Sequence, residues 1–544
     1  MNTRQLQTDK NQKLYHALLG ILLVCALAMM MLLSYWACKY SYYGAVDGRT
    51  RGVLVGDKTW AHIAAFFAAS LCTMGIDKVL MKKDKSQQEK ICLCTLIVTS
   101  VIAFILGVFY VCKNPYYPVG DQINTTAFAA YCRDGNFSML SIGGYVGMYQ
   151  QQKGLAILYE ILFTLFGDFN YRPAKILHVV WWILTILAGY GFLKLNTDRP
   201  VFRMLYCVMM LGCFPLLFYL PYIYGDVLSI SFGIILFYGV AAYEHYGQKR
   251  YIALASFAAG LAVLARKNTW IVLVAVAVYV LLVSLRKKKV RYLMAGTAIL
   301  LTAALSVKAV DVIYEVRSGY PSGVGIPSIL WVAMGLQETQ GRAGVYNRYQ
   351  QATFTDYDCQ QELAAQQGKE YIRERLEEFS QDPGMAFNFF KSKVEGQWIE
   401  PMYAALESTE SFEEGAELSP VLESLYYGEL GRTIWKLTNY YQSILYLAGL
   451  MALVMLGILW WKKKEVPISL WLPWIAVFGG FLFSILWEAK SRYVFPYCVF
   501  MILYVPEGLY QTGLLLCKLP KLRKFKKSGH TQDKGEEASL RETA

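Results

Sequence analysis

The sequence predicts an all-α membrane protein that crosses the bilayer about twelve times. Of its 544 residues, 56% are hydrophobic and only 17% are charged, which is unlike a soluble globular domain. The hydrophobic residues gather in runs of about 20, the length that a helix needs to span a bilayer. These runs lie at 14–36, 59–76, 91–112, 174–194, 204–220, 226–244, 251–265, 269–286, 290–310, 441–461, 467–487 and 493–516.

The basic residues indicate which loops face the cytoplasm. Lys and Arg number 53 against 40 acids, giving a net charge of +13. An excess of Lys and Arg marks cytoplasmic loops, so both termini of this multi-pass cell-membrane protein are predicted to be cytoplasmic. Because the basic residues form short clusters between spans, nucleic acid is not the predicted partner. The clusters lie at 77–90, 194–203, 247–250, 286–291, 461–465 and 518–530.

The apolar stretch 154–167 decides the side on which every later loop lies. As a span it would turn the later basic clusters outward, against the positive-inside rule. A helix of this length covers only about 21 Å, less than the bilayer core of about 30 Å. We therefore expect a helix on the outer membrane surface, with a short true span as the alternative.

With 154–167 placed on the outer membrane surface, the sequence predicts five parts of the chain. The segment 311–440 is polar but carries helical patterns, and Asp382 followed by Pro383 predicts the start of a helix. The predicted parts are a two-span extension at 1–90, a transmembrane core at 91–310 with a first outer loop at 113–173, the outer helical segment 311–440, the last spans at 441–517, and a basic cytoplasmic tail at 518–544.

Cysteine and histidine give no metal signature. Most of the twelve cysteines lie inside predicted spans, where they act as small apolar residues, and the five histidines are scattered. Cys132 and Cys359 both fall in outer loops and could pair, but sequence cannot establish their proximity. Within the last span, Pro506 and Gly508 flank Glu507 and predict a kink.

Charged residues collect at the outer ends of spans instead of inside them. Four turns far apart in the chain would bring acids and bases to one membrane face. They are Asp121 after the third span; "PYIYGD", ending at Asp226; "ARKN", with Arg266, Lys267 and Asn268; and "EAKSRY", with Glu488, Lys490, Arg492 and Tyr493.

Each of these residues also has a structural interpretation. Asp121 and Asp226 could form turns or cap helices. Arg266 and Lys267 could anchor spans at the interface. Glu488 and Arg492 have the i,i+4 spacing of a helical surface ion pair.

The joint arrangement favours glycosyl transfer from a lipid phosphate at the outer face. Arg266, Lys267 and Arg492 would bind the donor phosphate and stabilise its charge as it leaves. Asp121 would act as general base on the acceptor hydroxyl in an inverting transfer. Further site candidates are Glu488, Tyr493, Asn268, Lys153 and Tyr149, the last as a surface on which a sugar could stack.

These motifs resemble those of the GT-C superfamily of polytopic glycosyltransferases, such as protein O-mannosyltransferases and aminoarabinose transferases. Asp121 resembles the acid of the family's first outer loop, which is followed by outer-surface helices and a span. The stretch "GLAVLARKN" at 260–268 and "EAKSRYVFP" resemble its later turns. The resemblance spans residues 91–516 and implies that Asp121 is the base and that Asp226 is a second site acid.

The resemblance also implies the partners. The donor would be a polyprenyl-phosphate sugar held among membrane lipids, and the acceptor a polysaccharide, lipid or protein of the cell envelope. No cofactor is required in principle, although a divalent metal is possible; the acidic pair of some members is replaced here by Asp121–Gln122. A lipid-linked sugar flippase and a polysaccharide polymerase are the alternative functions, and a partner-binding membrane protein is a third.

Overall fold

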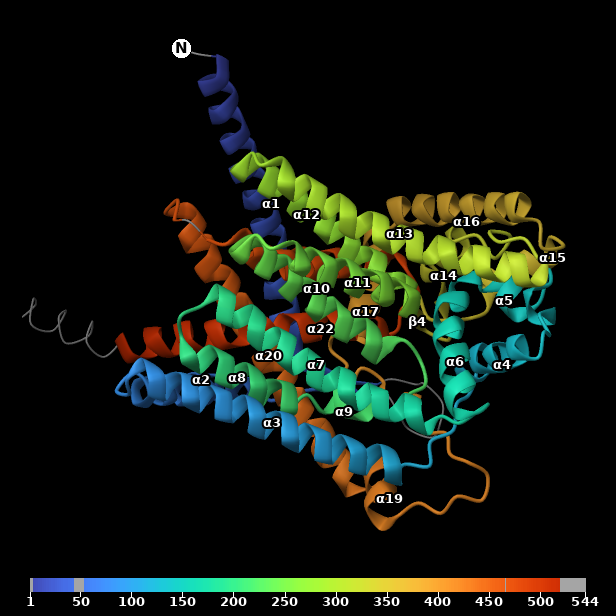
Figure 1. Ribbon diagram of the computed structural model, residues 1–544, viewed down its shortest axis with the longest axis horizontal. Helices are drawn as coiled ribbons and strands as arrows, with labels where there is room; N and C mark the ends of the chain where they lie inside the picture. Colours follow the sequence, from blue (N-terminus) through green and yellow to red (C-terminus); the bar gives the residue numbers. More distant parts are fainter. Residues whose placement is uncertain (1–2, 44–52, 465, 519–544) are drawn as a thin grey trace, which may run out of the picture.

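The computed structural model describes residues 3–43, 53–464 and 466–518, and it is 78% helical. Figure 1 shows long helices running beside one another, with shorter helices gathered at one end. The predicted all-α class is therefore confirmed, and the helices fit a polytopic membrane protein.

Within the described ranges, nine helices are long and apolar enough to cross a membrane. A tenth is α22 (Ser491–Met501), which η5 (Ile502–Tyr504) joins to a second helical stretch at 505–518. The nine helices are α1 (Thr3–Lys39), α2 (Thr59–Leu80), α3 (Lys85–Lys113), α7 (Arg172–Asn196), α10 (Asp226–Tyr246), α12 (Trp270–Lys287), α13 (Val290–Ser318), α20 (Glu429–Trp461) and α21 (Leu472–Leu486), the last preceded by η4 (Ile468–Trp471).

Two of the twelve predicted spans take another form. The run 204–220 is two helices, α8 (Pro200–Leu211) and α9 (Phe214–Phe218), because Gly212 ends the first and Pro215 begins the next. The run 251–265 becomes α11 (Lys249–Ala265), whose 17 residues cover about 26 Å. The expected kink is present as a bend of 59°, placed just before Pro506.

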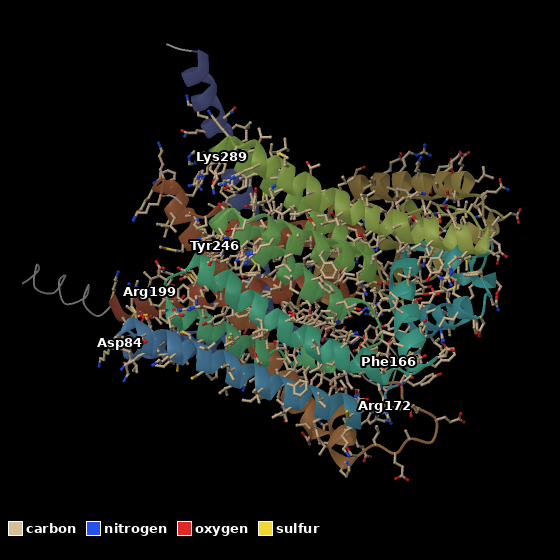
Figure 2. The ribbon with its side chains drawn as sticks, in the orientation of Figure 1. Asp84, Phe166, Arg172, Arg199, Tyr246 and Lys289 are labelled. Carbon is tan, nitrogen blue, oxygen red and sulfur yellow. The ribbon has the colours of Figure 1, made fainter. Side chains whose placement is uncertain are left out.

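The loops alternate between two ends of the bundle. In Figure 2, Arg199, Tyr246 and Lys289 lie toward one end, and Phe166 and Arg172 toward the other. We call these the basic end and the Phe166 end. This alternation agrees with the predicted sorting of loops, while the assignment of the Phe166 end to the outside of a cell stays a prediction.

The segment 113–173, which the sequence predicts to be the first outer loop, folds into short helices at the Phe166 end. They are α4 (Asp121–Arg133), η1 (Ser138–Leu140), α5 (Tyr145–Met148), η2 (Gln150–Gln152) and α6 (Lys153–Phe166). Helix α6 has 14 residues and lies crosswise to the long helices in Figure 1. Its exposed residues include Ile161, Leu165 and Phe166, so it presents an apolar face as a surface helix does.

The segment 311–440 is folded, and its predicted cap at Asp382 is confirmed by a hydrogen bond of 2.9 Å from the Met385 amide. A short ribbon and six helices follow α13. They are α14 (Ile329–Gly335), β3 (Glu338–Thr339), β4 (Arg342–Ala343), α15 (Tyr349–Asp356), α16 (Gln361–Gln381), α17 (Pro383–Trp398), α18 (Ala405–Ser408) and α19 (Pro420–Tyr427). A second antiparallel ribbon, β1 (Tyr40–Tyr43) with β2 (Val53–Gly56), joins α1 to α2.

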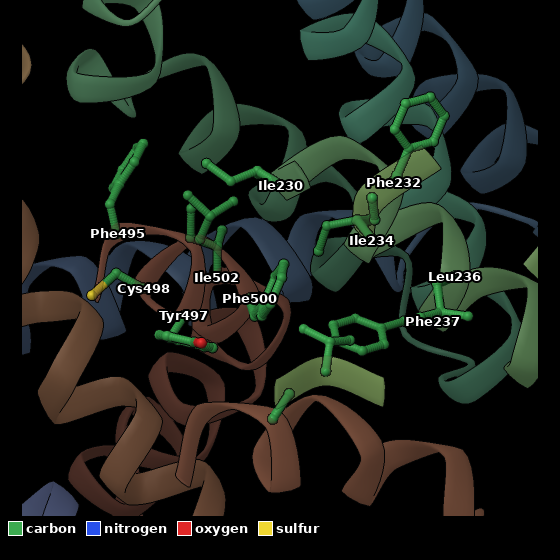
Figure 3. Packing of buried hydrophobic residues seen from close by; sticks show 14 of the residues in the cluster. Ile230, Phe232, Ile234, Leu236, Phe237, Phe495, Tyr497, Cys498, Phe500 and Ile502 are labelled. Carbon is green, nitrogen blue, oxygen red and sulfur yellow. The ribbon is translucent and has the colours of Figure 1, made fainter. Parts of the chain in front are cut away.

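Helix α10 lies at the centre of the apolar core, with 83% of its most apolar window buried. It packs against α7, α11 and α22. Figure 3 shows this contact, in which the rings of Phe237 and Phe500 meet edge to face at 4.9 Å. This packing holds α10 in place, including its first residue, Asp226.

Close packing of the last helix on α20 gives a testable prediction. A Cβ on Gly508 would lie 1.8 Å from the Ala448 carbonyl oxygen. We expect Gly508→Ala to lower the free energy of unfolding by about 1–3 kcal/mol through overpacking, seen as a lower Tm in detergent. Gly75→Ala is the matched control, because nothing lies within 4 Å of its Cβ position. Equal Tm values for the two variants would contradict this packing.

A buried carboxyl group shapes the turn after α17. Glu400 accepts a hydrogen bond of 2.8 Å from the Met402 amide, and Tyr403 and Ala404 follow with φ values of 50° and 56°. Burial, reinforced by the Glu407 carboxylate, raises the pKa of Glu400 to about 8. The group is therefore protonated in the folded protein at neutral pH.

This pKa predicts a pH-dependent stability. Between its ordinary pKa of 4.5 and about 8, Glu400 is protonated when folded and ionised when unfolded. The folded state binds more protons there, so stability falls as pH rises through that window. We expect the Tm of the wild type to fall across pH 5 to 8 more steeply than that of Glu400→Gln. Glu423→Gln, at an exposed position on α19, should keep the wild-type slope.

Candidate functional site

A cavity of about 640 Å³ opens at the Phe166 end of the bundle, and we call it the first cavity. All four predicted polar turns contribute to its wall or floor, together with the segment 328–351. Its charged lining residues are Asp121, Arg266, Lys267, Arg348, Glu488, Lys490 and Arg492, and its other predicted members are Tyr149, Asn268 and Tyr493.

Asp121 is exposed in the first turn of α4, where the helix N-terminus favours a carboxylate. Gly120, with φ of 58°, makes the turn into this helix. The Tyr145 hydroxyl donates a hydrogen bond of 2.7 Å to Asp121 Oδ1. Burial and the nearby carboxylate raise the pKa of Tyr145, so this hydroxyl stays protonated. One carboxylate oxygen is thus fixed by Tyr145, and the group still faces the cavity.

Asp226 lies beneath the cavity instead of lining it. Its side chain is 2% exposed, and its Oδ2 accepts a hydrogen bond of 2.9 Å from Arg266. Removing either partner would leave a buried charge unpaired. Asp226 is therefore placed as the counter-ion of Arg266, one step away from the cavity surface.

Arg266 and Arg492 share aromatic neighbours. The guanidinium of Arg266 lies 5.2 Å from the Tyr224 ring centre and 5.4 Å from that of Tyr493. The guanidinium of Arg492 lies 5.1 to 5.5 Å from the rings of Tyr222, Tyr224 and Tyr493. The electron-rich ring faces attract these cations and hold both guanidinium planes in place.

Arg266 has a counter-ion in Asp226, whereas Arg492 lacks one among the described residues. It is 6% exposed, yet among the described residues it forms no ion pair, and its Nε has no hydrogen-bond partner. The predicted ion pair with Glu488 is not formed within the described part of the chain. A buried cation without a counter-ion is costly, so an anion in the cavity would stabilise it.

Glu488 lies on the same turn as Arg492, between α21 and α22. Its side chain is buried and accepts a hydrogen bond of 3.3 Å from the Tyr493 hydroxyl. Burial raises the pKa of Glu488 to about 7. Close by, Lys393 of α17 is 1% exposed and donates to the Gly335 carbonyl, and burial lowers its pKa to about 7. Both groups therefore titrate near neutral pH.

Aromatic rings form one side of the first cavity. Tyr149 lies 5.1 Å from Tyr145 and 6.2 Å from Trp331, measured between ring centres. Trp331 stacks on Trp487 at 5.9 Å with an interplanar angle of 4°. Flat rings of this kind provide a surface on which a sugar ring can pack.

The side chain of Lys153 does not line the first cavity, contrary to its selection as a site candidate. It pairs with Asp311 and donates hydrogen bonds of 2.9 Å to Gln150 and 2.8 Å to Ser322. It lines a neighbouring cavity of about 190 Å³, whose wall it shares with Lys267. Lys153 therefore fixes the start of α6 and does not reach the first cavity.

Sequence reasoning did not find the contribution of the segment 328–351. Trp331 projects from α14, while Tyr346, Arg348 and Gln350 follow the β3–β4 ribbon. The ribbon is held to the site by a hydrogen bond of 2.6 Å from the Ala489 amide to the Gly344 carbonyl. The one available signal is the apolar stretch 324–335 inside an otherwise polar segment.

Neither metal ligands nor a disulfide are found in the described residues. No group of three His, Cys, Asp or Glu side chains there is placed to hold a metal ion. Cys132 is buried, Cys359 is half-buried, and both are free thiols. The pairing left open by the sequence is therefore not formed.

Fold and cavity together define the class: an all-α polytopic membrane protein with a charged cavity at one end of its bundle. No model of a known protein family matches the chain, and no curated protein or solved structure matches it. The chemistry of the cavity is thus the basis on which a function is argued.

Proposed function

We propose that this protein transfers a sugar from a polyprenyl-phosphate donor to an acceptor of the cell envelope, at the extracytoplasmic face. The main support for this proposal is one cavity that contains Asp121 together with the three cations Arg266, Lys267 and Arg492. This cavity lies at the Phe166 end of the bundle, opposite the basic end. An anionic headgroup would meet cations at that depth while its lipid chain stays in the membrane.

The reaction is a single displacement. Asp121 takes the proton of the acceptor hydroxyl, whose oxygen then forms a bond to the anomeric carbon. The bond from that carbon to the phosphate oxygen breaks, and its electron pair leaves with the lipid phosphate. Arg492, Arg266 and Lys267 stabilise the negative charge that develops there. The sugar is transferred with inversion at the anomeric carbon.

The surroundings of Lys267 suit a lipid-linked donor. This exposed residue lines both the first cavity and the neighbouring cavity of about 190 Å³. The neighbouring cavity also contains Val263, Leu264, Trp270 and Val310, whose side chains are compatible with a prenyl chain. A donor that lies across Lys267 would place its phosphate in the first cavity and its prenyl chain in the neighbouring apolar cavity.

The test is transfer by the purified full chain in nanodiscs. Synthetic polyprenyl-phosphate sugars and polyprenyl-diphosphate oligosaccharides are offered separately with an envelope polysaccharide or glycolipid extract. We expect transfer from the monophosphate donors. Transfer from the diphosphate donors alone would favour a polysaccharide polymerase, and donor movement across the bilayer without transfer would favour a flippase.

The same assay tests whether sugar transfer requires a divalent metal ion. Asp121 and Glu488 both line the first cavity and could contribute to a site for a divalent cation with the donor phosphate. Full transfer in EDTA would assign the stabilisation of the phosphate to the cationic side chains. Loss of transfer in EDTA, restored by added Mg²⁺ or Mn²⁺, would assign it to a metal ion.

A further inference from the structure

A second cavity of about 550 Å³ lies outside the site described above. It is enclosed by the chain from Glu400 to Glu410, by α19 and by the start of α20. Tyr43 of β1 contributes a further side chain. The residues that define its chemistry are Glu400, Glu407, Glu410, Tyr426, Tyr427 and Trp435.

The two cavities have opposite charge. Five Lys and Arg side chains and two acids line the first cavity. Three glutamates line the second cavity. Glu400 is protonated at neutral pH, so Glu407 and Glu410 carry the negative charge of this lining. Its basic lining residue, Arg432, is already paired with Glu429 at 2.6 Å. An anionic lipid phosphate is therefore attracted to the first cavity and repelled by the second.

Aromatic rings give the second cavity its apolar surfaces. Tyr43 and Trp435 meet edge to face at 5.1 Å, and Tyr426 lies 5.0 Å from Phe412. The Trp435 indole nitrogen is buried and finds no hydrogen-bond acceptor in the described part of the chain. Because that nitrogen has almost no accessible surface, the ring faces are what the second cavity offers to a ligand.

One turn separates the two cavities. Lys490 lines the first cavity, and its charge acts on Glu488 there and on Glu407 of the second. The next residue, Ser491, contacts Glu400 through its side chain. A ligand in the second cavity would thus be separated from the first by the turn 488–492.

We infer that the second cavity binds an uncharged saccharide portion of the acceptor, at a distance from its reacting hydroxyl. Ring faces pack against sugar rings, and carboxyl groups accept hydrogen bonds from sugar hydroxyls. The acidic lining selects against phosphorylated saccharides. The role as an acceptor subsite rests on the proposed function, while saccharide binding itself does not.

Binding can be measured without a donor. Full-length protein in nanodiscs is titrated by calorimetry with a panel of neutral oligosaccharides built from hexoses, N-acetylhexosamines and deoxyhexoses, and with their phosphorylated forms. We expect at least one neutral member to bind in a way that depends on Trp435, and this Trp435-dependent binding to be tighter than that of its phosphorylated form. Trp435→Ala should weaken that binding by about tenfold through loss of a stacking surface, and Glu410→Gln should weaken it less. Glu423→Gln, exposed on α19 outside the cavity, is the control.

The inference fails if no neutral saccharide binds, if the binding that depends on Trp435 is tighter for phosphorylated forms, or if binding is unchanged in both cavity variants. Asp121→Asn should leave saccharide binding intact, because Asp121 lies in the other cavity. Saccharide binding without sugar transfer would reject the proposed function and keep the second site. Transfer that is insensitive to Trp435→Ala would reject the acceptor role alone.

Discussion

Asp121→Asn should lower kcat for sugar transfer by roughly 10²–10⁴-fold, the range expected when a general base is removed. Asparagine keeps the shape of the side chain, and its carbonyl oxygen can still accept the hydrogen bond that Tyr145 donates at 2.7 Å. The fold and the donor contacts should therefore persist. What is lost is the negative charge that takes the proton from the acceptor hydroxyl.

The measurement is single-turnover transfer in nanodiscs, with Tm as the test of folding. Asp134→Asn is the matched control, because Asp134 is also exposed and follows the other end of the same helix, α4, away from the cavity lining. We expect wild-type rates from this control. A fully active Asp121→Asn protein would remove Asp121 from the reaction, and a lowered Tm would show that the change acts on folding.

The spans were largely predictable because hydrophobic length is a local property of the sequence. Ten of the predicted runs correspond to the nine long helices and the bent pair. The run 204–220 is not one continuous helix, because hydropathy does not register the break that Gly212 and Pro215 impose. The sequence predicted the short helix that the structure shows as α6, while its position at the membrane surface stays a prediction.

The site was predictable only in part. Charged residues in turns between spans must lie at a membrane face, so their gathering at one end follows from topology. Which of them reaches the cavity depends on packing: Asp226 lies below Arg266, and Lys153 pairs with Asp311. Arg348 escaped notice because the β3–β4 ribbon that brings it to the cavity depends on contacts distant in sequence, such as Ala489 with Gly344.

Arg492→Met should lower kcat/KM for the lipid-linked donor by roughly 10²–10³-fold, as when a charge-stabilising donor is removed from a reaction site. It should do so without lowering Tm. The guanidinium is buried against three tyrosine rings but forms no ion pair in the described chain, so its charge is a cost to the empty protein. Methionine keeps the apolar contact with the rings and removes that cost.

Ligand binding distinguishes a phosphate-binding role of Arg492 from a purely structural one. Polyprenyl phosphate should raise the Tm of the wild type, because its phosphate supplies the anion that Arg492 lacks, and it should raise the Tm of Arg492→Met much less. Neutral polyprenol should affect both proteins equally. Arg250→Met is the matched control, since Arg250 lies 5.0 Å from the Tyr251 ring at the first residues of α11, far in sequence from the cavity turns. If Arg492→Met instead lowers Tm and leaves the response to polyprenyl phosphate unchanged, Arg492 holds the tyrosine rings together and the phosphate binds elsewhere.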